Sequence, residues 1–124
     1  MGDFNDNPFD TSINNILNAK SEKKTVGRTE LFNPMMNMYK KGMGTLAYRD
    51  ELSLFDQMLF SKPFLNKDYS SYKIYKAGIF NPLYITNNKG QYKGYPYRSF
   101  NGSNWTNGYS DHFPVYTYII KELN

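Results

Sequence analysis

Hydrophobic and polar positions alternate in three stretches of the chain, over residues 52–61, 72–80 and 115–120. Successive side chains of a β-strand point to opposite faces, so this alternation predicts three strands. The first stretch has the most regular pattern, and one of its faces consists of Leu54, Asp56, Met58 and Phe60.

Asp56 is the polar exception on that otherwise apolar face. A buried carboxylate without a partner costs several kcal/mol, roughly, so in the interior it requires a donor or a cation beside it. The alternative is an Asp56 that faces solvent or caps an edge strand, where it needs no partner. The pattern alone leaves both interpretations open.

Two short helices are predicted in the first third of the chain. Apolar residues at helical spacing predict a helix over 13–20, with Thr11 and Ser12 as candidates for its N-cap. A second helix is predicted over 35–41, because Pro34 stands at its first turn. Its methionines are expected to fill core space rather than to bind a ligand.

The remaining segments are rich in charged residues, glycine and asparagine, which predicts loops over 21–28, 44–51, 82–96 and 98–108. No internal repeat or linker divides the chain, and its length suits one domain over residues 1–124. The mixture of helices and strands predicts an α/β (α+β) fold.

Composition narrows the function only a little. The chain has no cysteine, which excludes disulfides and thiolate metal sites and leaves the compartment open. Neither a signal peptide nor a membrane span is predicted. A net charge of +4 favours anionic partners without requiring nucleic acid. Aromatic residues make up 18% of the chain, enough to stack on bases or sugars, although tyrosines along strands also serve ordinary sheet packing.

The only histidine, His112, follows Asp111 in a loop that leads into the predicted strand 115–120. Aspartate and histidine are the residue types that hold a divalent metal and move a proton, so this pair is a candidate for hydrolytic chemistry. A surface turn is the alternative for so short a motif.

Three segments occur in a fixed order: Gly2-Asp3-Phe4-Asn5, then 56–61, which begins with aspartate and ends with serine, then Ser110-Asp111-His112-Phe113-Pro114-Val115. Together they resemble the C-terminal half of the endonuclease/exonuclease/phosphatase superfamily. The segment 44–49 resembles a substrate-side loop of that superfamily more loosely. The resemblance implies a DNase I-like four-layer α/β/β/α sandwich, of which this chain supplies about the C-terminal half.

The resemblance also implies roles for individual residues. Asp3 orients or deprotonates the attacking water, and Asn5 hydrogen-bonds a phosphate oxygen. His112 stabilises charge on the scissile phosphate, while Asp56 accepts a hydrogen bond from the other ring nitrogen. Asp111 helps to hold the metal, which is usually Mg²⁺, with Mn²⁺ as a substitute.

The chain departs from the superfamily pattern in one respect, because the principal glutamate metal ligand belongs to the half that precedes these motifs. We therefore expect weak metal binding and little or no activity from the 124-residue chain alone. We also expect an apolar sheet face that the other half, a second copy or a swapped partner covers.

The leading prediction for function is a metal-dependent phosphodiesterase, a nuclease rather than a phosphatase. Segment 92–105 forms the substrate rim, and Arg49 and Arg98 are candidate phosphate contacts, with surface salt bridges as their alternative. The second prediction is a sugar-phosphate or lipid head-group phosphodiesterase on the same fold. A non-catalytic module whose aromatic residues, such as Trp105, stack on glycans or nucleobases is the third.

Overall fold

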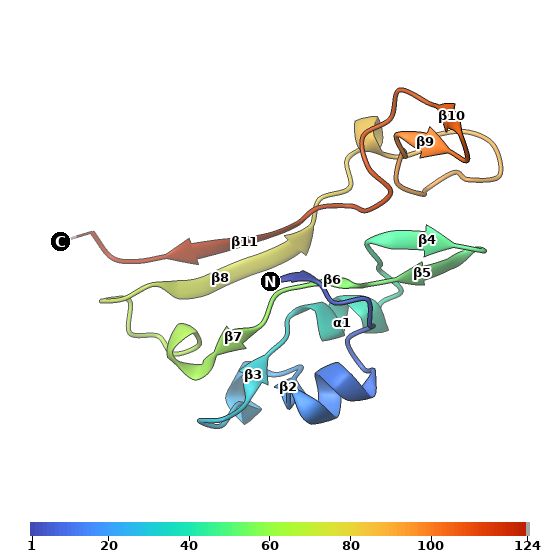
Figure 1. Cartoon of the computed structure of the whole chain (residues 1–124). Coiled ribbons are helices and arrows are strands. Elements are labelled where there is room, and N and C mark those ends of the chain that lie inside the picture. The colour runs from blue at the N-terminus through green and yellow to red at the C-terminus, as the bar shows by residue number, and fades with distance from the viewer. Residues whose placement is uncertain (124) are drawn as a thin grey trace.

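The structure is a computed structural model that describes residues 1–123. Figure 1 shows a long β8–β11 ribbon on one side, β2, β3 and helical turns on the other, and a projecting lobe that contains β9 and β10. The elements in chain order are β1 (Gly2–Asp3), the π-helix η1 (Ser12–Ile16), β2 (Ala19–Lys20), the 3-10 helix η2 (Lys23–Thr25), β3 (Leu31–Phe32), α1 (Met35–Lys40), β4 (Leu46–Tyr48), β5 (Glu51–Ser53), β6 (Asp56–Gln57), β7 (Phe60–Ser61), the 3-10 helix η3 (Lys62–Phe64), β8 (Lys73–Ile79), the 3-10 helix η4 (Leu83–Ile85), β9 (Phe100–Asn101), β10 (Asn104–Trp105) and β11 (Val115–Ile120).

The strands of the described residues form five small sheets. β3 lies between a parallel neighbour, β2, and an antiparallel neighbour, β7. The other four sheets are antiparallel pairs, β1 with β6, β4 with β5, β8 with β11 and β9 with β10. The predicted mixture of helix and strand is therefore confirmed, but it is distributed over short elements.

Three predicted elements are confirmed with nearly their predicted bounds. The second helix is α1, and the alternating stretches 72–80 and 115–120 contain β8 and β11. Met35 and Met36 are fully buried, as expected for methionines that fill the core.

The single strand predicted over 52–61 is wrong, because the segment contributes to three different sheets. β5 pairs with β4, β6 pairs with β1, and β7 pairs with β3. Between β5 and β6 the amide of Leu54 donates to the side chain of Asn7 at 2.9 Å instead of to a strand. Leu54, Met58 and Phe60 are all buried as the pattern indicated, but Gln57 on the opposite face is buried as well.

The helix predicted over 13–20 is also wrong beyond its first turn. It ends at Ile16, and Asn18 has a φ of +51°, a left-handed conformation that stops a right-handed helix. Ala19 and Lys20 then become β2. No side chain caps the start at Thr11, and the Ser12 hydroxyl donates to the Asp6 carboxylate at 2.5 Å.

Two of the predicted loops contain hairpins. Segment 44–51 holds β4 and the start of β5, joined by Arg49 and Asp50 with φ values of +50° and +65°. Two successive positive φ values make a turn whose twist matches paired strands. Segment 98–108 holds the β9–β10 hairpin, whose turn includes Gly102 at a φ of +60°.

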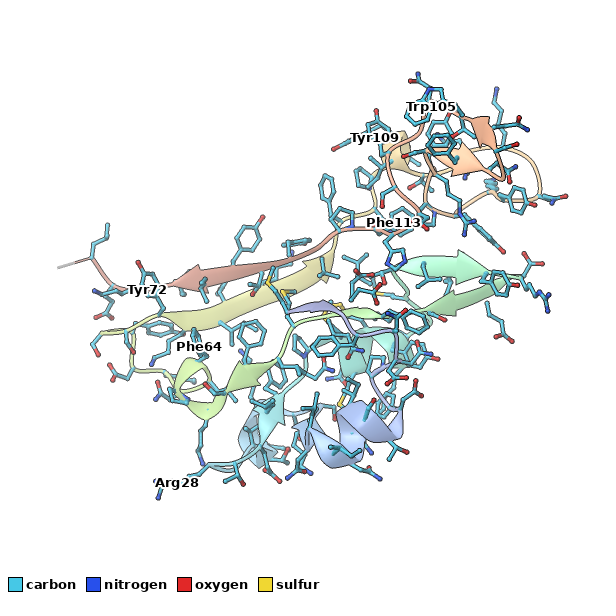
Figure 2. The ribbon with its side chains drawn as sticks, in the orientation of Figure 1. Arg28, Phe64, Tyr72, Trp105, Tyr109 and Phe113 are labelled. Atoms are coloured by element: carbon cyan, nitrogen blue, oxygen red, sulfur yellow. The ribbon has the colours of Figure 1, made fainter. Side chains whose placement is uncertain are left out.

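Of the two buried hydrophobic clusters in the part of the chain that the structure describes, the larger joins the two sides of the molecule. It brings together buried residues from β3, α1, β7 and β8, and its members are Val26, Phe32, Met35, Leu54, Met58, Phe60, Ile74, Ile79, Ile85 and Phe113. In Figure 2 the labelled Phe113 lies where the projecting lobe meets the rest of the chain. This packing anchors the histidine loop, since Phe113 follows His112 directly. Among the described residues, no helix has the length and hydrophobicity needed to cross a membrane.

A buried chain of side-chain amides holds the N-terminal segment against β6. The Asn33 amide nitrogen donates to Gln57 Oε1 at 2.7 Å, and Gln57 Nε2 donates to the Asp6 carbonyl at 2.6 Å. The Met35 N–H donates to Asn33 Oδ1 at 2.9 Å. Both amide residues have 0% exposure, so their hydrogen bonds replace water completely.

Asn33→Ala is expected to lower the free energy of unfolding by about 2–4 kcal/mol, because it leaves two buried groups, on Gln57 and Met35, without a partner. Urea denaturation measures the change. The control is Asn37→Ala on α1, where an exposed amide donates to the Ser21 carbonyl at 2.8 Å and the expected loss is below about 1 kcal/mol. Equal losses in the two variants would show that the buried amides are not a special constraint.

Candidate functional site

The first and second sequence motifs meet in the β1–β6 pair. Asp3 lies directly opposite Asp56 in this antiparallel ladder. Directly opposed residues of two strands place their side chains on the same face of the sheet, with Cβ atoms about 4.5–5.5 Å apart. Two carboxylates from residues 53 positions apart in the chain therefore become neighbours.

The third motif joins them through the histidine. His112 Nδ1 lies 2.7 Å from Asp56 Oδ2, and the two side chains are 26% and 20% exposed. A carboxylate only accepts, so Nδ1 carries the proton that is donated, and Nε2 is the nitrogen that remains for a ligand. The partly buried Asp56 thus has the partner that its place in an apolar strand requires.

Thr45 holds the two partners of this contact at the right positions, although sequence reasoning missed it. It is completely buried, and its N–H donates to the Ser53 carbonyl at 2.8 Å. Its carbonyl accepts from the Phe113 N–H at 2.7 Å, and its hydroxyl accepts a long hydrogen bond from the Asp56 N–H at 3.4 Å. One threonine therefore touches the residue after His112 and the backbone of Asp56. No periodic pattern marks a threonine inside a predicted loop.

Gly44 is required beside Thr45 for a steric reason. A Cβ atom at this position would lie 2.8 Å from the Ser53 carbonyl oxygen and 2.9 Å from the Leu52 Cβ. Such contacts are closer than packed atoms allow, so a side chain at Gly44 would push β5 away.

Asn5 lies just past the end of the β1–β6 ladder. Its N–H donates to Asp3 Oδ1 at 2.8 Å, and its φ of +53° turns the backbone out of the strand direction. The preceding Phe4 N–H still donates to the Phe55 carbonyl at 2.9 Å. Asp3 and Asn5 are both exposed, so their side chains are available to a ligand on this side of β6.

Asp111 is exposed and takes no part in the hydrogen bond between His112 and Asp56. It lines a shallow cleft of about 300 Å³ together with Arg98, Phe100 and Tyr109. The neighbouring Ser110 hydroxyl accepts from the His112 N–H at 3.1 Å, which fixes the turn between them.

The two arginines line a larger cleft of about 550 Å³ between the β4–β5 hairpin and the tyrosine-rich segment 87–106. Arg98 donates from Nη2 to the Ala47 carbonyl at 3.2 Å and borders both clefts. Arg49 is exposed, and its guanidinium lies 5.2 Å from the ring centroid of Tyr48. Neither arginine belongs to a salt bridge within the described residues.

Two residues of the larger cleft's lining, Tyr95 and Asp50, are linked to each other. The Tyr95 hydroxyl donates to Asp50 Oδ1 at 2.6 Å and accepts from the Asp50 N–H at 2.7 Å. The hydrogen bond to the carboxylate raises the pKa of Tyr95 above its ordinary value, because loss of the proton would place two negative charges together.

The described residues contain hard oxygen ligands but no group of three His, Cys, Asp or Glu side chains that could hold a metal ion. Mg²⁺ is usually bound by one or two carboxylates together with water and substrate phosphates. Asp3 and Asp111 are exposed carboxylates without a salt bridge among the described residues, so they fit such an open site. They do not form a closed cage.

Comparison with known proteins identifies one family. Residues 1–121 match the model of a family described as "Endonuclease/Exonuclease/phosphatase family". Neither the curated proteins nor the solved structures include a match. The match spans all three motifs and both clefts.

Asp50→Asn is expected to lower the pKa of Tyr95 towards its ordinary value, because the charged acceptor is lost. Ring NMR during an alkaline titration measures the change, and Tyr95→Phe identifies the signal. Since the pKa is raised in the folded state, the link contributes stability below about pH 10 and loses it as the pH rises through the folded pKa. Glu51→Gln, which removes a neighbouring charge without this hydrogen bond, should leave the titration of Tyr95 nearly unchanged. An unaltered titration in Asp50→Asn would contradict the assignment.

Proposed function

Because the chain belongs to the endonuclease/exonuclease/phosphatase family, whose members act on phosphate esters, we propose that it hydrolyses phosphodiester bonds with the help of a divalent metal. The observation that carries this proposal is the 2.7 Å contact between His112 and Asp56, with Asp3 opposite Asp56 in the ladder. A positioned imidazole beside two carboxylates has the groups that in-line attack on a phosphate needs.

In this proposal the residues of the three motifs have separate tasks, and Asp3 has two of them. His112 donates from Nε2 to a non-bridging phosphate oxygen and stabilises the charge that grows there. Asp56 accepts from Nδ1–H and stabilises the doubly protonated ring, the form in which Nε2 also carries a proton to donate, as a carboxylate partner of histidine does in other hydrolases. Asp3 orients and deprotonates the attacking water, and the Asn5 amide donates to a second phosphate oxygen.

Mg²⁺, with Mn²⁺ as a substitute, is the proposed cofactor, and Asp111 and Asp3 would supply ligands. When bound, the metal polarises the phosphate. The open ligand set supports weak binding, and therefore low turnover by the 124-residue chain alone.

A nuclease is favoured over a phosphatase by the cations beside the site. Arg98 borders both clefts, Arg49 stands at the hairpin tip, and the chain has a net charge of +4. A polymer with phosphates on both sides of the scissile bond can use such separated cations, whereas a small monoester cannot reach them together. Phosphatase activity, or cleavage of a sugar or lipid phosphodiester, remains the alternative on the same fold.

The order of the three motifs supports a further part of the proposal, that the chain corresponds to the C-terminal half of a four-layer sandwich. β11 carries exposed apolar side chains, with Tyr118 56%, Ile119 48% and Ile120 36% exposed. A partner, either the other half or a second copy, would cover this surface.

The first test compares His112→Ala and Asp56→Asn with the unaltered sequence in the intact protein that includes the proposed other half, because low turnover is expected from the 124-residue chain alone. Each variant should lower kcat/KM for bis(p-nitrophenyl) phosphate with Mg²⁺ by about 10²–10⁴-fold. Asp68→Asn, an exposed carboxylate away from the motifs, is the control and should retain the original rate. Unchanged turnover in His112→Ala would overturn the proposal, and cleavage of only p-nitrophenyl phosphate would exclude the nuclease.

His112 also offers a readout that does not require turnover, because it is the only histidine in the chain. Its ring ¹⁵N signals should move when a phosphorothioate dinucleotide, which resists hydrolysis, is added. Asp56→Asn should shift the Nδ1 signal, because Nδ1 loses its carboxylate partner. A ring that does not respond to the dinucleotide would argue for a binding module whose aromatic residues act elsewhere.

Metal binding has a separate measurement. Mn²⁺ broadens the NMR signals of nearby residues, so signals of Asp111 and Asp3 should broaden at low Mn²⁺ and recover with EDTA. Asp111→Asn should raise the Mn²⁺ concentration needed several-fold, because one of few ligands loses its charge. Broadening confined to other carboxylates, such as Asp68, would show that the metal ligands are assigned wrongly.

A further inference from the structure

The cleft of about 550 Å³ between the β4–β5 hairpin and segment 87–106 has the size of a small-molecule site. We propose that it holds a nucleobase of the substrate, so that the phosphodiester cleaved at His112 belongs to a nucleic acid strand. The inference rests on the proposed function and adds a substrate class and a second subsite to it. Four features of the cleft support it.

The first feature is a wall of tyrosine rings that the fold has already fixed. The hydroxyl of Tyr95 is engaged by Asp50, and the hydroxyl of Tyr97 donates to the Thr106 carbonyl at 2.7 Å. Because both polar ends are bonded within the protein, these tyrosines offer the cleft their rings. A ring that is fixed before binding loses little conformational entropy when a planar ligand stacks on it.

The second feature is the segment that carries these rings, which is held by its own backbone. The Asn87 N–H donates to the Tyr95 carbonyl and the Gly94 N–H to the Asn87 carbonyl, both at 2.8 Å. The Tyr97 N–H donates to the Ile85 carbonyl at 2.8 Å, which ties the segment to a buried residue. The wall of the cleft is therefore preformed.

The third feature is the pair of exposed rings in the lining. Tyr48 is 61% exposed and Tyr92 is 47% exposed. The guanidinium of Arg49 lies over the Tyr48 ring, the arrangement in which arginine planes and aromatic rings also stack on bases. Polar edges are available beside them, since the side-chain amides of Gln91 and Asn101 make no hydrogen bond within the described residues and each can donate and accept.

The fourth feature is the position of Arg98, which connects this cleft with the one that contains Asp111. One of its five N–H donors is used by the Ala47 carbonyl, so the others can bind a phosphate between the two clefts. A ligand with a ring in the larger cleft and a phosphate at Arg98 has the composition of a nucleotide.

A sugar is a weaker fit for the same cleft. Neighbouring hydroxyls of a sugar are bound well by a carboxylate that accepts from both. Asp50 is the only acidic residue in the described lining, and Tyr95 already binds one of its two carboxylate oxygens. The lining instead combines rings, amides and guanidinium groups, which match a heteroaromatic base and its phosphate.

The experiment compares AMP with ribose 5-phosphate, which has the same sugar and phosphate but no base. Both are titrated in EDTA, so that binding is measured without hydrolysis, by isothermal titration calorimetry. AMP should bind about 5- to 150-fold more tightly, the effect of one stacked base of about 1–3 kcal/mol. Tyr48→Ala should remove most of that difference, while Arg98→Gln should weaken both ligands.

Tyr75→Ala is the matched control, because this tyrosine is 67% exposed on β8 and outside the cleft. It should leave the preference for AMP intact. Equal affinity for AMP and ribose 5-phosphate, or an AMP preference that survives Tyr48→Ala, overturns the inference. Circular dichroism of Tyr48→Ala confirms that the exposed substitution leaves the fold unchanged.

The results separate this inference from the proposed function. Loss of bis(p-nitrophenyl) phosphate hydrolysis in His112→Ala without any preference for AMP would retain the phosphodiesterase and reject the base cleft. A Tyr48-dependent preference for AMP in a chain whose hydrolysis ignores His112→Ala would retain the base cleft and reject the catalytic assignment. Deoxyadenosine monophosphate in place of AMP distinguishes DNA from RNA as the source of the base.

Discussion

The antiparallel pairing of β1 with β6 fixes the position of everything else in the site. It places Asp3 opposite Asp56. The pairing depends on the buried amides of Asn33 and Gln57, because Gln57 donates to the Asp6 carbonyl of the N-terminal segment and is itself held by Asn33. A ladder of two residue pairs is too short to be stable alone, so these side-chain hydrogen bonds must compensate for its length. The geometry of the proposed catalytic groups is thus set by residues that make no contact with a substrate.

The contact between Asp56 and His112 is also held in place by residues outside the proposed catalytic group. Thr45 joins the β4–β5 hairpin to the Asp56 and Phe113 backbones, while Phe113 is packed in the core. His112 therefore has a rigid support on its C-terminal side and a carboxylate at its ring. A group held in this way loses little entropy when it binds a ligand, which is the usual advantage of preorganisation.

Sequence patterns predicted the parts of the fold in which one period governs a whole element. β8, β11 and α1 belong to this class, because each makes one continuous set of contacts. Segment 52–61 does not, since its period of two runs unchanged through changes of pairing partner that depend on residues far away in the chain. The turn at Arg49 and Asp50 was missed for a different reason, because neither residue is the glycine or asparagine that usually signals positive φ.

The candidate site was found through its motifs and not through local patterns. Asp56 and His112 are 56 positions apart, and the order of three motifs brought them together where periodicity could not. Thr45 and the buried amides escaped prediction because their importance comes from tertiary hydrogen bonds. Of the proposed base cleft, the cleft of about 550 Å³, the sequence predicted only Arg49, Arg98 and the aromatic segment 92–105. The shape of the cleft depends on how two hairpins and a loop face each other, which no local pattern specifies.

The turn at the tip of the β4–β5 hairpin has a strained backbone conformation. A left-handed conformation costs roughly 1–2 kcal/mol for an ordinary residue and less for aspartate, and Arg49 and Asp50 both adopt it. A tip of asparagine and glycine would fold with less strain, but it would offer neither the guanidinium over Tyr48 nor the carboxylate bound by Tyr95. The hairpin tip therefore exchanges some stability for chemical groups in the wall of a cleft, a compromise typical of surfaces shaped by binding and not by folding.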